Sequence, residues 1–206
     1  MKRTVIFILS LMLGTAGAQF LDYYQPQVFA GAGAGVFRIS LENFKSVYTD
    51  RWGPILNGHA GVRFFKAYYA MARYQRFEKN GRKGLHEETG YALKDAAWHE
   101  TQLDFGLRIH PPFVKKANSY YGFGVVFYHI KEQPNLSVFT SHYGPPDSGW
   151  GNGFYLEFGL EYCPYPAASL FFETEISSGG LHGRTGFEAF SVGGFCFALG
   201  LHVYPF

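Results

Sequence analysis

The 206-residue sequence predicts an all-β protein, an eight-stranded antiparallel up-and-down transmembrane β-barrel with a polar, side-chain-filled lumen. Three observations lead to this fold class. Apolar and polar residues alternate with a period of two along most of the chain, which indicates strands with two unlike faces. The connections between these segments are alternately short and long. The apolar face is almost free of charged residues, as the lipid-facing wall of a barrel must be.

The first 18 residues have the features of a cleavable signal peptide. Lys2 and Arg3 form a basic start, residues 4–13 are apolar, and Ala16 and Ala18 are the small residues that a signal peptidase accepts. We expect cleavage after Ala18, a periplasmic segment at 19–26 and the barrel at 27–206. The alternative is a buried N-terminal helix or strand. A transmembrane helix would need about 20 apolar residues, more than this run offers.

Composition excludes several classes of protein. Lys and Arg number 18 and Asp and Glu 16, but Lys2 and Arg3 lie in the predicted signal peptide, so the mature chain would be neutral. A neutral chain does not predict a nucleic-acid-binding protein. Cys163 and Cys196 are the two cysteines and fall on non-adjacent predicted strands, so we expect two free thiols rather than a disulfide scaffold.

The strands are predicted at eight segments, with the apolar set of each on one face: 27–39, 55–65, 67–78, 97–109, 120–131, 153–163, 169–177 and 190–204. The first of them alternates Ala and Gly at 30–35, and such small residues would let the wall approach neighbouring side chains closely. Short turns are expected after strands two, four and six. The other connections are long and polar: 40–54, 79–96, 132–152 and 178–189.

Because lipid offers no hydrogen-bond partner to the backbone, a sheet in lipid has to close on itself. The apolar face would then point outward, with an interfacial girdle of Tyr68, Trp98, Tyr121 and Tyr162. The alternative is a soluble exported barrel, lipocalin-like, which would bind an apolar ligand and turn its apolar face inward.

The second face would fill the lumen. Its charged members are Arg63, Arg73, Arg108, Glu100, Asp104, Glu157, Glu161, Glu173 and Glu175, and its neutral polar members are His59, His202, Gln75 and Gln102. Side chains nearly fill an eight-stranded barrel, so we expect a packed ionic network and no wide pore. Since acids outnumber the arginines, some carboxyls should hold protons near neutral pH or pair with a histidine.

The sequence resembles the small eight-stranded outer-membrane β-barrel proteins of Gram-negative bacteria. The features that carry the resemblance are the signal ending at Ala16 and Ala18, the Gly/Ala-rich stretch 30–35, the eight alternating segments and the aromatic C-terminus. Tyr204 and Phe206 look like the signal read by the barrel assembly machinery, although Pro205 departs from the usual pattern. The resemblance implies an outer-membrane location, contact with outer-membrane lipid and periplasmic termini.

For function, we expect a structural or surface-interaction role, in which the four long loops meet an extracellular partner. Basic residues in and near the second loop, namely Arg76, Lys79, Arg82 and Lys83, could meet lipopolysaccharide phosphates. The alternative is an outer-membrane lipid-modifying hydrolase, because Ser141, His142 and Asp147 are the residue types of a hydrolytic triad. We expect no cofactor, and no metal site, since the histidines lack ligand spacing.

Overall fold

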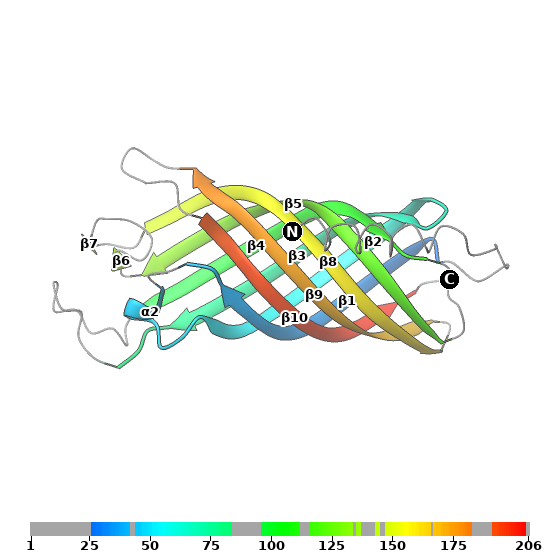
Figure 1. Ribbon diagram of the computed structural model, residues 1–206, viewed down its shortest axis with the longest axis horizontal. Coiled ribbons are helices and arrows are strands. Elements are labelled where there is room, and N and C mark those ends of the chain that lie inside the picture. Colours follow the sequence, from blue (N-terminus) through cyan, green and yellow to red (C-terminus); the bar gives the residue numbers. More distant parts are fainter. Residues whose placement is uncertain are drawn as a thin grey trace, which may run out of the picture.

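The computed structural model describes residues 26–41, 44–83, 96–111, 116–133, 135–136, 143–144, 147–165, 167–182 and 191–204. Antiparallel strands close into a barrel (Figure 1). The barrel strands are β1 (Val28–Ile39), β2 (Trp52–Phe65), β3 (Tyr68–Asn80), β4 (Ala97–Ile109), β5 (Ala117–Gln133), β8 (Asp147–Tyr165), β9 (Ala168–His182) and β10 (Ser191–Val203). Helix α2 (Phe44–Val47) and the short strands β6 (Asn135–Leu136) and β7 (Tyr143–Gly144) lie in the connections.

Each barrel strand pairs with the strands before and after it, and β10 returns to pair with β1, with Ala30 opposite Val203 and Ile39 opposite Gly194. Every barrel strand therefore has a hydrogen-bonded neighbour on both sides. Closure satisfies the backbone N–H and C=O groups without water, as a wall in contact with lipid requires. The predicted fold class is confirmed.

The strands are longer than predicted at one end of the barrel. Strand β8, which corresponds to the sixth predicted strand, begins at Asp147 rather than at 153. Strand β9 runs to His182 rather than to 177. Glycine and small polar residues in these extensions hide the alternation, yet their backbones pair in register, with Asn152 opposite Gly180. Pairing of extended backbone does not require bulky side chains, so the sequence pattern stops before the sheet does.

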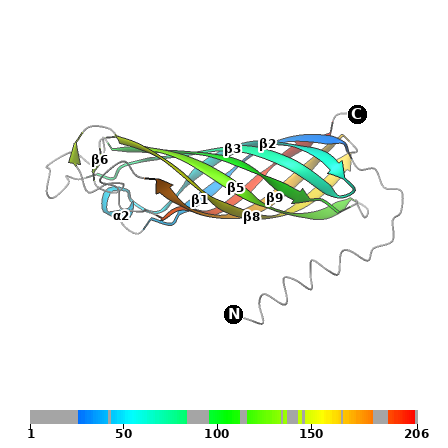
Figure 2. The same ribbon diagram turned by 90° about the horizontal axis from the view of Figure 1, so that it is seen from above.

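The two ends of the barrel differ. At the turn end lie the two-residue turn at Lys66 and Ala67, the ends of the other two short connections at His110 and Lys116 and at Tyr165 and Ala167, and the described chain ends, Pro26 and Tyr204. At the loop end lie the strand ends that the four long connections join, namely Ile39 and Trp52, Asn80 and Ala97, Gln133 and Asp147, and His182 and Ser191. The side view shows α2 and β6 together at the loop end (Figure 2). The predicted alternation of short and long connections is thus present.

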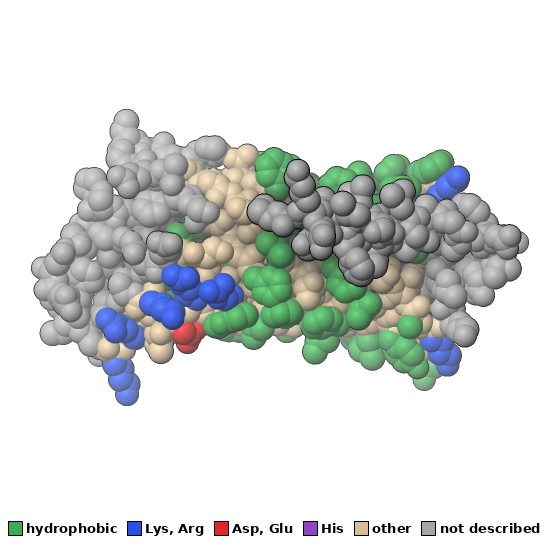
Figure 3. Space-filling model, in the orientation of Figure 1, with side chains coloured by type: hydrophobic (Ala, Val, Ile, Leu, Met, Phe, Trp, Pro, Cys, Tyr) green, Lys and Arg blue, Asp and Glu red, His purple; other side chains and the backbone are tan. Residues whose placement is uncertain are grey.

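The apolar face points outward. Phe154 is 74% exposed whereas the next residue, Tyr155, is 1% exposed, and this alternation recurs along the strands. A belt of exposed apolar side chains surrounds the middle of the barrel, where Figure 3 shows hydrophobic residues between basic groups at the two ends. This orientation is opposite to that of a soluble lipocalin-like barrel, so that alternative is wrong. Among the described residues, no helix is long and apolar enough to span a bilayer.

One member of the expected aromatic girdle was assigned to the wrong face. Tyr68 and Tyr162 are exposed on the outer wall, but Trp98 is fully buried inside the barrel. Trp98 lies two positions before Glu100, with only His99 between them, and the two therefore share the inward face of β4. Both cysteines are free thiols, as expected, with Cys196 buried and Cys163 half-buried.

Candidate functional site

The middle of the lumen holds two buried guanidinium groups surrounded by carboxylates. We name this set the arginine cluster; its members are Arg73, Arg108, Asp104, Glu157, Glu173 and Glu175. Strand pairing brings these residues together, because Arg73 lies directly opposite Asp104 on β4, and Glu157 opposite Glu175 on β9. All six side chains are at most 3% exposed.

The ion pairs of the arginine cluster are close. Arg73 Nε lies 2.9 Å from Asp104 Oδ2, and its Nη2 lies 2.9 Å from Glu157 Oε2 and 2.7 Å from Glu175 Oε2. Its Nη1 pairs with Glu173. Arg108 Nη2 donates to Glu173 Oε2 at 2.8 Å, which joins the two arginines through one carboxylate. Burying these charges is tolerable only because each has several opposite partners.

Aromatic and amide groups complete the cluster. The Arg108 guanidinium lies over the Tyr120 ring, 4.1 Å from its centroid, and the Tyr120 hydroxyl donates to Glu173 Oε2 at 2.9 Å. Gln75 Nε2 donates to Asp104 Oδ2 at 3.1 Å and to Glu175 at 3.0 Å. These contacts add charge-assisted hydrogen bonds and stacking to the ion pairs. The result is a filled cross-section of side chains.

Glycine on an intervening strand makes these contacts possible. Gly122 on β5 lies opposite Arg108 on β4 and opposite Glu157 on β8, and a Cβ at Gly122 would collide with the Glu157 carboxylate. Gly159 on β8 likewise separates Tyr120 from Glu173. A Cβ there would collide with the Tyr120 ring. The missing side chains therefore leave room for two long polar groups to meet across a strand.

Two further buried acids lie toward the loop end. Glu100 accepts hydrogen bonds from Gln102 Nε2 at 2.8 Å and from Trp98 Nε1 at 3.3 Å. Glu132, also fully buried, accepts one from the Tyr48 hydroxyl at 3.3 Å. Glu132 is absent from the predicted lumen residues because 132–152 is expected to be a loop, whereas β5 continues to Gln133.

A second polar group of side chains surrounds Glu161 at the turn end. We name it the histidine cluster; it comprises His59, His110, His202, Glu161, Ser169 and Tyr204. His110 Nε2 lies 2.5 Å from Glu161 Oε2, and His202 Nδ1 lies 2.8 Å from Glu161 Oε1. The Ser169 and Tyr204 hydroxyls also donate to Glu161. His110 is absent from the predicted lumen residues, although it lies two positions after Arg108 and therefore on the same inward side of the alternation that runs along β4.

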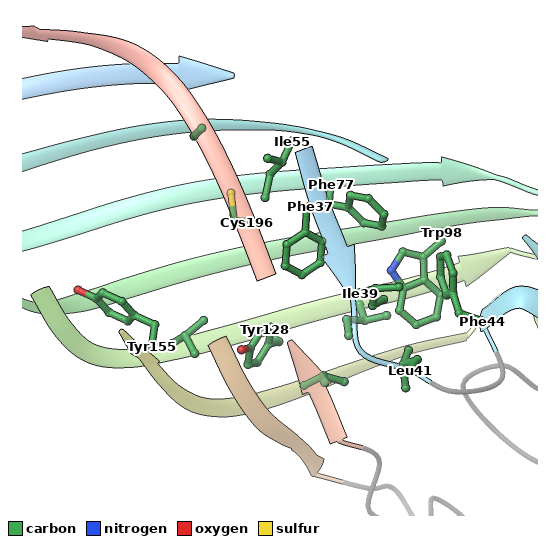
Figure 4. Packing of buried hydrophobic residues seen from close by; sticks show 14 of the residues in the cluster. Phe37, Ile39, Leu41, Phe44, Ile55, Phe77, Trp98, Tyr128, Tyr155 and Cys196 are labelled. Carbon is green, nitrogen blue, oxygen red and sulfur yellow. The ribbon is translucent and has the colours of Figure 1, made fainter. Parts of the chain in front are cut away.

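At the loop end, aromatic rings close the lumen. We name this set the aromatic plug; it consists of Phe37, Phe44, Tyr48, Phe77 and Trp98, each at most 1% exposed. Phe44 stacks on Tyr48 with ring centroids 4.3 Å apart and meets Trp98 edge-on at 5.4 Å. Figure 4 shows Phe44 beside Trp98, with Phe37 and Phe77 packed together. Burial is the main cause that raises the pKa of Tyr48 above its ordinary value, and the neighbouring Glu132 raises it further.

The segment that carries Phe44 and Tyr48, two of the five plug residues, is tied to the wall. The Ile39 amide donates to the Arg51 carbonyl and the Ser40 amide to the Gly193 carbonyl, each at 3.0 Å. Lys79 Nζ donates to Asp50 Oδ1 at 3.0 Å. This hydrogen bond is the main cause that lowers the pKa of Asp50 below the ordinary value of a carboxyl. The first long connection is thereby held across the barrel mouth.

Charge is separated between the inside and the outside of the wall. Of the described acidic side chains, seven are buried: Glu100, Asp104, Glu132, Glu157, Glu161, Glu173 and Glu175. The exposed Glu78 is paired with Arg76 and His99, and Asp50 with Lys79. The exposed described basic side chains are Arg38, Lys45, Lys66, Arg76, Arg82, Lys83, Lys116 and Lys131. Among the described residues, the exterior is thus more basic than the balanced composition of the sequence implies.

The remaining predicted site residues are placed as follows. Arg63 lies half-buried near the turn end of β2, away from the middle of the lumen where the arginine cluster sits. Ala16, Ala18, Ser141, His142 and Phe206 lie outside the described residues, as does the side chain of Asp147. In the part of the chain that the structure describes, no group of three or more His, Cys, Asp or Glu side chains could hold a metal ion.

The closed wall, the outward apolar belt and the ionic lumen define a transmembrane β-barrel of the outer-membrane type. No protein-family model and no curated protein matches the sequence. Solved structures do match. Neisserial surface protein A (NspA) aligns with a TM-score of 0.62 and 12% identity, over 87% of this chain and 97% of its own.

Two more solved structures support the same fold. The outer membrane protein OprG from Pseudomonas aeruginosa aligns with a TM-score of 0.54 and 11% identity, over 89% of this chain and 98% of its own. Ail, the attachment invasion locus protein of Yersinia pestis, solved in complex with the heparin analogue sucrose octasulfate, gives 0.52 and 12%, over 87% and 99%. The chain therefore has the fold of the small eight-stranded outer-membrane barrels of Gram-negative bacteria.

Proposed function

We propose that the protein is an outer-membrane barrel with a structural or surface-interaction role, whose wall is a rigid support for the loop end and whose lumen is not a wide pore. The observation that carries this proposal is the filled cross-section: the arginine cluster occupies the middle and the aromatic plug the mouth. A barrel filled in this way offers its loops, rather than its interior, to other molecules.

We further propose that the loop end faces the cell exterior and that both termini are periplasmic. Support comes from the even number of barrel strands and from Pro26 and Tyr204, which both lie at the turn end. The predicted signal peptide at 1–18, with its cleavage after Ala18, and the periplasmic segment at 19–26 belong to the same proposal. Longer connections on the outer side are the usual arrangement in outer-membrane barrels.

Labelling on whole cells tests this orientation. Lys83→Cys places a thiol at the loop end and Lys66→Cys at the turn end, both at exposed positions. A membrane-impermeant maleimide should label Lys83→Cys on intact cells and Lys66→Cys only after the outer membrane is permeabilised. The unsubstituted chain, with its native Cys163 and Cys196, provides the background. Labelling of Lys66→Cys alone on intact cells would contradict the proposal.

For the partner of the loop end, we propose polyanions that carry phosphate or sulfate. The exposed basic side chains described at this end are Arg38, Lys45, Arg76, Arg82, Lys83 and Lys131, whereas seven of the nine described acidic side chains are buried in the lumen. Figure 3 shows Lys and Arg side chains gathered at the loop end. The similarity to Ail, whose structure holds a heparin analogue, favours the same ligand chemistry.

Salt-dependent binding tests the proposed partner. Purified protein should bind heparin more tightly than uncharged dextran, and binding should weaken as ionic strength rises. A double variant, Arg82→Ala with Lys83→Ala, should bind several-fold more weakly, whereas the matched pair Lys66→Ala with Lys116→Ala at the turn end should bind as the unsubstituted chain does. Equal loss in both double variants would leave only a non-specific charge effect and would contradict a loop-end site.

A further inference from the structure

Gly31 lies between two histidines of the lumen. It is the cross-strand partner of His59 on β2 and, on its other side, of His202 on β10. A Cβ at Gly31 would collide with both rings, so only glycine lets the imidazoles meet over β1. Their Nε2 atoms lie 2.8 Å apart. Because β1 and β10 are the strands that close the barrel, this contact crosses the closing seam.

The partners of each nitrogen indicate where the protons lie. His202 Nδ1 lies 2.8 Å from Glu161 Oε1, and since a carboxylate accepts, Nδ1 carries the proton. His202 Nε2 then accepts from His59 Nε2–H, and Arg108 Nη1 approaches the same nitrogen at 3.5 Å. His59 Nδ1 is buried without a hydrogen-bond partner, which suits an unprotonated nitrogen better than an N–H.

We infer that the His59–His202 pair is a proton-sensitive clasp across the β1–β10 seam. One hydrogen fits between two nitrogens at 2.8 Å, so the clasp holds while at most one of the two imidazoles is cationic. When both are cationic, each Nε2 carries a hydrogen and the two N–H groups face each other. The hydrogen bond is then lost and two like charges meet in a buried place, so the rings separate and the seam weakens.

Among the surrounding charges, Glu161 favours a cation at His202, whereas Arg108 lies near both imidazoles and opposes a second cation on the pair. The titratable and charged groups packed around the pair are Tyr69 and Arg73 from β3, Arg108 from β4, His110 after it, Tyr120 from β5, Glu157 and Glu161 from β8, Glu173 from β9, and Tyr204. Glu161 contacts His202 directly, whereas Glu157 and Glu173 are bound by Arg108. From β1 itself come Gly31 and Phe29, which do not titrate.

An acid-dependent unfolding experiment tests the clasp. The full-length barrel in detergent micelles is unfolded by SDS and heat at about pH 7.5 and about pH 4.5, on either side of the range in which histidine gains its charge. His59→Gln keeps an N–H donor near the position of Nε2 but does not titrate. The unsubstituted chain should unfold roughly tenfold faster at the lower pH, equivalent to about 1.4 kcal/mol, and His59→Gln should lose most of this acceleration.

His99→Gln is the matched control, because His99 lies on the outer face of β4 beside Glu78. The unfolding of this variant should be accelerated at the lower pH as much as that of the unsubstituted chain. Equal acceleration of His59→Gln and the unsubstituted chain would overturn the clasp. A second measurement does not depend on the variant folding: imidazole ¹⁵N spectra of the unsubstituted chain at neutral pH should show His202 protonated at Nδ1 and His59 at Nε2. Stabilisation of the unsubstituted chain by ZnCl₂ alone would also overturn it, by showing that the two nitrogens bind a cation.

Discussion

Arg108 and Glu157 form a two-pronged ion pair across Gly122: Arg108 Nε lies 2.7 Å from Glu157 Oε1, and Arg108 Nη2 lies 3.0 Å from Glu157 Oε2. The same arrangement, two long polar side chains that meet over a glycine, recurs at Tyr120, Gly159 and Glu173. It recurs again at the clasp over Gly31. Glycine at these inward positions is therefore part of the interior packing rather than a weakness in the strand.

The first prediction concerns this use of glycine. Gly122→Ala should destabilise the barrel by about 1–3 kcal/mol, because the added methyl group displaces the Glu157 carboxylate from Arg108. The matched control is Gly58→Ala on β2, where the nearest atom to an added Cβ is 3.9 Å away. Urea unfolding in detergent micelles measures both. A smaller loss for Gly122→Ala than for Gly58→Ala would contradict the packing described.

The second prediction concerns the arginine cluster. Arg73→Met removes the partner of several buried carboxylates and should cost about 3–5 kcal/mol or prevent folding. Arg76→Met removes an exposed arginine from the outer face of the same strand, where water screens its pair with Glu78 and the loss should be small. Heat-modifiable mobility in SDS gels reports the folded fraction of each. Similar folded fractions for the two variants would show that the buried ion pairs do not stabilise the barrel.

The third prediction concerns the aromatic plug. Trp98→Ala leaves a cavity against Phe44 and removes the indole donor to Glu100, so it should cost about 3–5 kcal/mol. Trp150→Ala removes a 61% exposed ring that stacks on His129 and should cost about 1 kcal/mol. Planar-bilayer recordings extend the test: the unsubstituted chain should form no stable wide pore. A steady porin-like conductance from the unsubstituted chain would contradict the filled lumen.

The fourth prediction concerns pH at the first long connection. The Lys79 ammonium and the Trp52 amide donate to Asp50 and lower its pKa, so the ionised carboxylate stabilises the folded state. This contribution is complete above the ordinary carboxyl pKa of about 4 and is lost as pH falls through the lower folded value. The pH titration of the carboxyl ¹³C shift should give Asp50 a titration midpoint below the ordinary value of about 4. Lys79→Met should raise this midpoint. An unchanged midpoint in Lys79→Met would contradict the assigned cause.

Much of the wall could be predicted from the sequence because a period of two with one apolar face leaves few other structures. Leu156 and Glu157, for example, must point to opposite sides of β8. Where side chains are small, the pattern fails: the glycine-rich start of β8 was assigned to a loop. Trp98 was misplaced because a Trp near a strand end suits an interfacial girdle equally well, and only its phase with Glu100 distinguishes the two positions.

The interior was harder to predict than the wall. The alternation assigns Arg73, Glu157 and Glu175 to the lumen, but which of them touch depends on the register of strands far apart in the chain. The contacts over Gly31, Gly122 and Gly159 depend on two registers at once. The inward position of Phe44 and Tyr48 could not be predicted from a periodic pattern of apolar residues, because α2 is a single turn. The excess of basic over acidic side chains on the described exterior likewise follows from where the described acids point.

The central claim is that the apolar side chains of the wall face lipid and the ionisable ones face the lumen. Quenching of tryptophan fluorescence by lipids brominated in the acyl chain tests it most directly, with Phe154→Trp on the outer face and Tyr155→Trp at the next, inward position. Because the native tryptophans contribute a constant background, the two variants are compared with the unsubstituted chain. The added fluorescence of Phe154→Trp should be strongly quenched and that of Tyr155→Trp spared. Quenching of Tyr155→Trp but not of Phe154→Trp would contradict the orientation of the wall.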